Sequence, residues 1–147
     1  MKFYIATGLE RGDEARALAE RLKELGHEIT YAWWEHGSVQ TEGPERIREV
    51  AVKELDGVTE AELFIALLPG GRGTHTELGA ALVCASESSY DYARNSKKVV
   101  LVGPTEQVDA SGQLRTCAFY LHPQVLERLA TVGELLAWLR GRQAFAP

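Results

Sequence analysis

The sequence predicts an α/β fold, a single domain in which helices cover both faces of one doubly wound sheet of five parallel strands. Short apolar runs alternate with stretches of helical periodicity along the 147 residues. Strands that alternate with helices form βαβ units, which place parallel strands in one sheet with right-handed crossovers. The wholly apolar run at 63–68 is typical of a strand buried on both faces, and a glycine-rich turn and a further helix follow it directly.

The first three strand–helix pairs extend to residue 86. We predict strands at 2–6, 27–33 and 62–68, and helices at 13–25, from Pro44 onward and at 74–86. Gly26 lies just past the first helix, where a glycine caps a C-terminus, and Pro44 suits the first turn of the second. Helical spacing predicts that the first helix buries Ala15, Leu18, Ala19 and Leu22, and that the second buries Ile47, Val50, Ala51, Leu55 and Val58.

The second half of the chain completes the sheet. Residues 86–96 extend the third helix or form a loop, a strand follows at 98–102, and 105–116 form a long loop. A fifth strand is predicted at 117–121, and one or two closing helices are marked by Leu126, Leu129, Leu135, Leu136 and Leu139. We therefore expect one domain over 1–141, with a flavodoxin-like or Rossmann-like sheet, and a frayed tail at 142–147.

Composition and charge exclude several classes of protein. The formal net charge of -5 argues against a protein that binds a nucleic acid polymer through a basic surface. No apolar segment approaches the length of a membrane span, and the chain enters its first strand directly, so we expect a cytoplasmic protein. Cys84 and Cys117 are then expected to be reduced, buried thiols. The four histidines lack the spacing of metal ligands, so no metal site is predicted.

The glycine-rich turn at 69–74 is the first candidate for ligand binding. Gly70, Gly71 and Gly73 allow close approach to the backbone, and their N–H groups lie with Arg72 at the start of a helix. In an open α/β sheet, ligands bind beyond the carboxyl ends of the strands. The turn therefore suits an anionic or hydroxyl-rich group, although it matches neither a P-loop nor a dinucleotide fingerprint. The alternative is a tight turn with a solvated arginine.

Glu77 lies close to this turn. If the helix starts near Thr74, the dipole at the helix N-terminus holds Glu77 ionised, as a carboxylate nucleophile requires. Such a nucleophile attacks an anomeric carbon through an oxocarbenium-like transition state. The alternative is a capping box, because residues 74–77 read Thr-His-Thr-Glu. His75 lies in the same junction between turn and helix.

Three further positions are candidates. Glu54 lies seven residues after Ile47, so it shares the apolar face of its helix, where a carboxylate needs a partner or a role. Its alternative is a glutamate at the edge of that face. Tyr4 lies within the first strand, near its C-terminal end, and is placed to orient Glu77 through its hydroxyl; the alternative is a core tyrosine. Trp33 or Trp34 stacks on a planar ligand, or both cover the core or a subunit interface.

Four segments together resemble the nucleoside 2-deoxyribosyltransferase superfamily. They are the strand at 3–6, the helix end at 57–62, the element Gly-Thr-His-Thr-Glu-Leu-Gly at 73–79 and the strand at 97–102, and the resemblance covers about 2–104. The resemblance implies that Glu77 attacks C1′ of a nucleoside and forms a glycosyl-enzyme intermediate. It also implies an active-site role for Glu54, and it matches Tyr4 to the family's first-strand aromatic.

One position departs from that family and narrows the expectation. Transferases commonly carry an aspartate six residues before the nucleophile, whereas this chain has Gly71 followed by Arg72. An arginine and free amides suit a 5′-phosphate, as in the nucleotide N-glycosidase branch of the superfamily. Residues 69–77 also fit locally the Pro-Gly-Gly-x-Gly-Thr-x-x-Glu motif of the lysine-decarboxylase-like phosphoribohydrolases. The predicted substrate-binding residues are Gly71, Arg72, Gly73, Thr74 and His75.

These observations predict an enzyme that cleaves or transfers at the N-glycosidic bond of a nucleoside or nucleoside 5′-monophosphate, with hydrolysis favoured over transfer. The catalytic residues are expected to be Glu77, Tyr4 and Glu54, with no cofactor. Because members of the superfamily complete each site from a neighbouring subunit, the resemblance implies a homodimer or higher homo-oligomer. The alternatives are a non-catalytic nucleotide-binding or sensing module, and an interaction domain in which Glu77 is only a helix cap.

Overall fold

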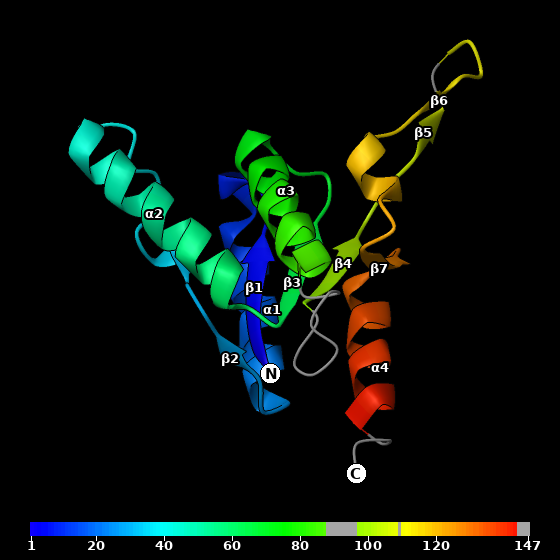
Figure 1. Cartoon of the computed structure of the whole chain (residues 1–147), viewed down its shortest axis with the longest axis horizontal. Coiled ribbons are helices and arrows are strands. Elements are labelled where there is room, and N and C mark those ends of the chain that lie inside the picture. The colour runs from blue at the N-terminus through cyan, green and yellow to red at the C-terminus, as the bar shows by residue number, and fades with distance from the viewer. Residues whose placement is uncertain (88–96, 109, 144–147) are drawn as a thin grey trace.

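The computed structural model describes residues 1–87, 97–108 and 110–143. Its sheet has five strands in the order β2-β1-β3-β4-β7, and every neighbouring pair is parallel (Figure 1). The strands are β1 (Lys2–Ala6), β2 (Glu28–Ile29), β3 (Leu63–Leu67), β4 (Lys98–Val102) and β7 (Val125–Leu129). This is the flavodoxin-like order, so the predicted fold class is confirmed.

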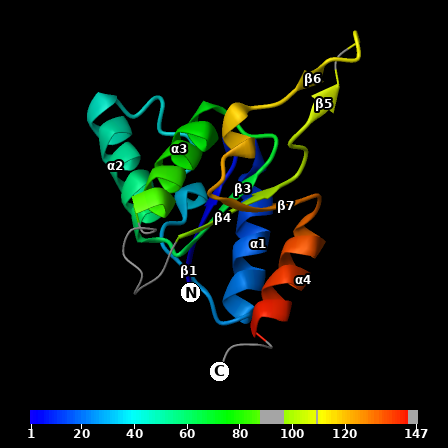
Figure 2. The same ribbon diagram turned by 45° about the vertical axis from the view of Figure 1, so that its right-hand side comes forward.

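Four α-helices cover the two faces of this sheet within the described residues: α1 (Gly12–Glu24), α2 (Pro44–Glu60), α3 (Arg72–Glu87) and α4 (Val132–Gln143). Figure 2 shows α1 and α4 on one face, and α2 and α3 on the other. Strands β1 and β3 are buried along almost their whole length, as strands covered on both faces must be. No helix in the described part of the chain is long and apolar enough to cross a bilayer.

The strand order places a topological switch between β1 and β3. From β1 the chain crosses one face through α1 to β2, and it returns over the other face through α2 to β3. The connections that leave the carboxyl ends of β1 and β3 therefore diverge, and a crevice opens between them. The candidate residues after β1 and after β3 consequently meet at one place in the fold.

The predicted fifth strand is wrong in position. Residues 118–121 form a short 3-10 helix, η4 (Ala118–Leu121), and the strand at the sheet edge is β7. Burial alternates along β7, with Val125 buried and Leu126 43% exposed, so its leucines follow a strand period and do not belong to a closing helix. Within the described residues up to 143, the closing helix is α4 alone, and it buries Leu135, Leu136 and Leu139.

Three smaller predictions also needed correction. The second strand is reduced to β2, because Trp33 already lies in a 3-10 helix, η2 (Trp33–Glu35). The predicted loop at 105–116 contains an antiparallel pair, β5 (Gln107–Val108) and β6 (Leu114–Arg115). Helix α4 continues through Gln143, two residues into the predicted tail, whereas 144–147 lie outside the described residues. Residues 88–96, for which the sequence left open a longer third helix or a loop, also lie outside the described residues.

Helix α2 turns a slightly different face inward from the one predicted. Val50 and Val58 are buried, but Ala51 is exposed and Leu55 is 42% exposed. Gly57 is also buried, so the inward face follows positions 50, 54, 57 and 58. Glu54 therefore lies in the middle of that face, which makes its placement relevant to the site.

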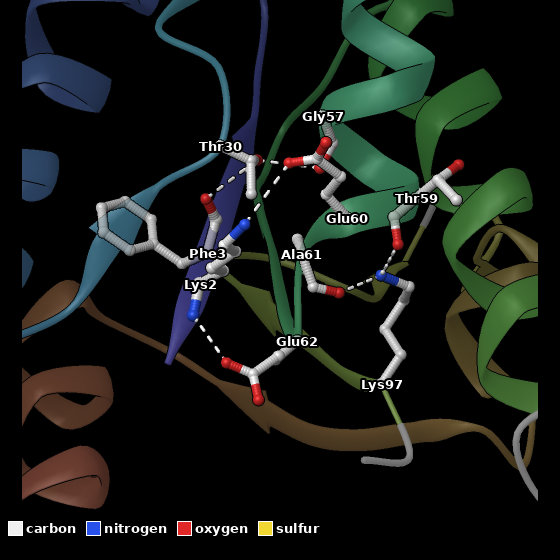
Figure 3. Close-up of polar contacts among 9 residues, drawn as sticks. All are labelled: Lys2, Phe3, Thr30, Gly57, Thr59, Glu60, Ala61, Glu62 and Lys97. Carbon is white, nitrogen blue, oxygen red and sulfur yellow. Dashed lines mark hydrogen bonds and ion pairs between the residues drawn. The ribbon is translucent and has the colours of Figure 1, made fainter. Parts of the chain in front are cut away.

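The C-terminal end of α2 is fixed to the sheet by polar contacts (Figure 3). Lys97 donates from its ammonium group to the carbonyl oxygens of Val58, Thr59 and Ala61. A cation at a helix C-terminus satisfies carbonyls that have no partner in the helix. The Thr30 hydroxyl donates to the Gly57 carbonyl at 2.8 Å. These contacts hold the last turns of α2, which carry Glu54 and Gly57, against the sheet.

Candidate active site

The centre of the candidate site is a hydrogen bond between β1 and α3. Tyr4 is fully buried in β1, and its hydroxyl donates to Oε1 of Glu77 at 2.5 Å. Glu77 on α3 is 8% exposed. Burial and the adjacent Glu77 carboxylate both raise the pKa of Tyr4, so its hydroxyl stays protonated and remains a donor. The contact between the Tyr4 hydroxyl and Glu77 is the one on which the expected positioning role of Tyr4 depends.

The reason for expecting an ionised Glu77 does not hold, because α3 begins at Arg72 and not near Thr74. Glu77 then lies in the second helical turn, beyond the reach of the dipole at the helix N-terminus. Its carboxylate bonds to Tyr4 in place of the backbone N–H groups that a capping box uses. Burial raises the pKa of Glu77 to about 8, the Tyr4 hydrogen bond opposes this rise, and the charge of Glu54 adds to it.

Glu77 lines a cavity of about 400 Å³ at the switch between β1 and β3. The size falls within the range of small-molecule sites. Four parts of the chain form its wall: the loop after β1 at 7–10, the segment from η2 to residue 40, the side of α2 that carries Ile47, Val50, Ala51 and Glu54, and the glycine-rich turn at 71–74. The cavity therefore lies where the fold predicts a ligand.

Glu54 reaches the same cavity from α2. Burial raises the pKa of Glu54, and the nearby His36 opposes that rise. The charge of Glu54 also acts on Glu77 and on Tyr4. The structure thus brings together three residues that the sequence predicted as one catalytic set, from β1, α2 and α3.

Gly57 is the residue that lets α2 lie close enough for this arrangement. A Cβ atom at Gly57 would lie 2.8 Å from Cβ of Tyr31 and 3.1 Å from two ring carbons of Tyr4. The first distance is shorter than real side chains allow, so any larger residue at Gly57 must displace the helix or the Tyr4 ring. The glycine therefore sets the position of the ring that holds Glu77.

The glycine-rich turn forms the opposite wall of the cavity. Gly71, Arg72, Gly73 and Thr74 all line it. A Cβ atom at Gly71 or Gly73 would meet nothing within 4 Å, and neither glycine has a positive φ. The fold itself therefore does not require glycine at these two positions, whereas a ligand lying against the backbone would.

His75 does not reach the wall of this cavity, although the sequence placed it among the substrate-binding residues. Its Nδ1 lies 2.7 Å from the Gly71 carbonyl oxygen and its Nε2 lies 2.7 Å from the Tyr120 hydroxyl. The two rings also stack, with centroids 5.6 Å apart. His75 thus braces the turn from outside. Among the described residues, no group of three or more histidines, cysteines and carboxylates gathers into a metal site.

Trp33 in η2 and His36 directly after it complete the wall. Trp33 and Trp34 are both buried, and the Trp33 indole N–H donates to the Ile5 carbonyl at 2.7 Å. Trp33 also lines the cavity, so it belongs both to the core and to the site. His36, which follows η2, lines the cavity as well. No sequence signal singled out His36, because it lies in an irregular segment without a motif.

Comparisons with known proteins support the fold. No family model and no curated protein matches the chain. Among solved structures, the chain is similar to the CMP N-glycosidase BcmB of Clostridium botulinum, with a TM-score of 0.54 and 19% sequence identity. The match covers 97% of this chain and 99% of that one. The two proteins therefore share their architecture from end to end at low identity.

Proposed function

We propose that the protein cleaves or transfers at the N-glycosidic bond of a nucleoside or nucleoside 5′-monophosphate, with Glu77 as the nucleophile. The observation that carries this proposal is the buried Glu77 carboxylate, held by Tyr4 at 2.5 Å and lining a cavity of about 400 Å³. The end-to-end similarity to a CMP N-glycosidase supports the same class of reaction. The Gly-Thr-x-x-Glu-Leu-Gly element at 73–79 supports it independently.

The reaction has two steps. In the first, a carboxylate oxygen of Glu77 bonds to C1′ as the C1′–N bond breaks, through an oxocarbenium-like transition state. The base leaves with the bonding electron pair and takes up a proton. In the second step, water attacks C1′ and frees the carboxylate, and the water gives up a proton; in transfer, a second base attacks in its place. Glu54 orients the sugar or the base.

The glycine-rich turn would hold the 5′ end of the sugar. Arg72 offers a guanidinium for a 5′-phosphate, and the first residues of α3 line the same cavity, so that the N–H groups at the helix N-terminus are available to the phosphate. Arg11 braces this turn, because it donates to the Pro69 carbonyl and makes two hydrogen bonds with Glu14. Arg72 is exposed, which leaves its charge accessible at the cavity mouth.

The test is release of free base, separated by chromatography, from a panel of nucleosides and their 5′-monophosphates. Parent protein and Glu77→Ala are compared, with Glu24→Ala as a control at an exposed glutamate on α1. The proposal expects release by the parent and the control and none by Glu77→Ala. Dependence on an added acceptor base separates transfer from hydrolysis. Arg72→Gln should reduce kcat/KM for the monophosphates more than for the nucleosides. Release by Glu77→Ala at the parental rate would contradict the role of Glu77.

A second candidate, a non-catalytic nucleotide-binding module, is favoured by one observation. A pKa of about 8 leaves the Glu77 carboxyl largely protonated near neutral pH, and a protonated carboxyl donates a hydrogen bond where a nucleophile must be ionised. This candidate predicts nucleotide binding that survives Glu77→Gln, with no turnover by the parent. Calorimetry on both proteins, combined with the base-release assay, distinguishes the two functions.

A further inference from the structure

His36 lines the cavity and carries a buried ring nitrogen without a partner among the described residues. Its Nδ1 lies 2.8 Å from the Gly37 carbonyl oxygen. Because a carbonyl oxygen only accepts, Nδ1 carries the proton in this contact, and the Nε2 of the neutral ring is left with an acceptor lone pair. Nε2 is buried and has no hydrogen-bond partner within the described part of the chain. The ring thus offers one unused acceptor at the wall of the candidate site.

Such atoms are rare in folded proteins and call for an explanation. Across residues 1–87, 97–108 and 110–143, the only other buried side-chain nitrogen or oxygen without a partner is the hydroxyl oxygen of Thr74. Thr74 is 2% exposed and lines the same cavity as His36. One ligand in this cavity would supply partners for both atoms, which explains why the fold leaves both without one.

The two atoms lie on different walls. Thr74 belongs to the first turns of α3, together with Glu77 and the turn that would hold the 5′ end of the sugar. His36 comes from the η2 side, which also supplies Trp33. The indole of Trp33 is fixed by its bond to the Ile5 carbonyl, and an aromatic wall suits a planar base. With the sugar beside Glu77, the η2 side is left for the base.

We infer that His36 recognises the base of the substrate, with Nε2 accepting a hydrogen bond from an N–H group of that base. This inference rests on the proposed function. The substrate class it names is a nucleoside whose base carries an amino or ring N–H donor on the edge that faces η2. His36 lies close enough to Glu54 to affect the pKa of the Glu54 carboxyl, so the histidine and the carboxylate act on the same end of the ligand.

The test compares substrates that differ by one donor. Suitable pairs are cytidine with the analogue that has hydrogen in place of the 4-amino group, adenosine with purine riboside, and uridine with 3-methyluridine. Their 5′-monophosphates serve equally well. For the pair whose donor faces His36, the parent should lose roughly tenfold to hundredfold in kcat/KM when the donor is removed, because Nε2 is then left unpaired. His36→Leu should lose a similar factor on the donor substrate and treat both members of the pair alike. His36→Gln, whose amide oxygen also accepts, should restore part of the preference.

Binding to Glu77→Gln, measured by calorimetry with the same pairs, repeats the comparison without turnover. If His36→Leu kept the parental ratio of kcat/KM between the two members of each pair, the inference would be overturned. It would also be overturned if His36→Leu lost kcat/KM equally on both members of every pair. If His36→Leu instead abolished discrimination between a nucleoside and its 2′-deoxy or 3′-deoxy form, His36 would contact the sugar and the assignment to the base would be wrong. The parent and Glu77→Ala distinguish the two failures, because the proposed function fails if the parent releases no base or if base release does not depend on Glu77, whereas the inference about His36 fails while both of these results hold.

Discussion

The Tyr4 hydroxyl and the Glu77 carboxylate lie 2.5 Å apart, although 73 positions separate them in the chain. The contact joins a central strand to the helix that follows the glycine-rich turn, and both residues are almost fully buried. A hydrogen bond to a charged carboxylate is stronger than one between neutral groups, so it favours the ionised form of Glu77. Burial acts in the opposite direction and dominates.

Removing the Tyr4 hydroxyl should therefore shift the pH dependence of activity. The reaction requires ionised Glu77, so kcat/KM should rise with pH around a midpoint near the pKa of about 8. Tyr4→Phe removes a hydrogen bond that lowers this pKa, so the midpoint should move to higher pH. Tyr120→Phe is the matched control. It removes the hydroxyl that contacts His75 outside the cavity, and it should leave the midpoint in place. An unchanged midpoint in Tyr4→Phe would show that the contact does not tune Glu77.

Neutralising Glu54 should shift the same midpoint in the opposite direction. The charge of Glu54 raises the pKa of Glu77, so Glu54→Gln should lower it and move the rise in kcat/KM to lower pH. The pH–rate profile of this variant is compared with that of Glu49→Gln, an exposed glutamate on α2. A shift to higher pH in Glu54→Gln would contradict the charge interaction between the two carboxylates.

The pKa of Glu77 also predicts a pH dependence of stability. The carboxyl ionises at about 8 in the folded protein and near 4.5 when unfolded, so between these values the folded state binds more protons. The free energy of unfolding should therefore fall as pH rises from about 4.5 through 8. Glu77→Gln removes this loss, so its stability relative to the parent should increase from pH 5 to pH 9 by a few kcal/mol at most.

Urea unfolding of both proteins at several pH values measures this difference directly. Glu24→Gln, at an exposed position of α1, is the control and should track the parent throughout. If the difference between Glu77→Gln and the parent did not change with pH, the folded-state pKa of Glu77 would have to lie near its unfolded value.

Gly57 should tolerate substitution much less well than a second helical glycine. Gly57→Ala places a Cβ atom 2.8 Å from Tyr31 and 3.1 Å from the Tyr4 ring, and overpacking of this kind costs about 1–3 kcal/mol. At Gly79 on α3, a Cβ atom meets nothing within 4 Å, so Gly79→Ala should gain up to about 1 kcal/mol from helix propensity. Thermal unfolding of both variants tests the contrast. Equal melting temperatures would mean that α2 moves away at little cost.

The sequence predicted the central part of the fold well. Strands β1, β3 and β4 are almost wholly buried, so each appears as a continuous apolar run whose type is readily recognised. At the sheet edges this signal fails, because β2 has only two residues and β7 alternates in burial. The leucines of β7 and α4 lie close together in the chain, so spacing alone assigned Leu126 and Leu129 to a helix.

The site was predicted in part for similar reasons. Helical spacing singled out Glu54, and the glycine-rich turn singled out Thr74 and Glu77. All three line one cavity in the structure. The raised pKa of Glu77 was not predicted, because it depends on where α3 begins and on how deeply the carboxyl is buried. His36 was missed, because its significance lies in an unpaired buried nitrogen, which only side-chain coordinates reveal.

The most direct test of the central claim is to trap the glycosyl-enzyme intermediate on Glu77. A 2′-fluoro nucleoside slows both steps by destabilising the oxocarbenium-like transition state, and a good leaving base lets the intermediate accumulate. Intact-protein mass spectrometry should then show an increase equal to one fluorinated sugar residue, and peptide mapping should place it on Glu77. Release of base without any adduct, or an adduct on another residue, would contradict the account.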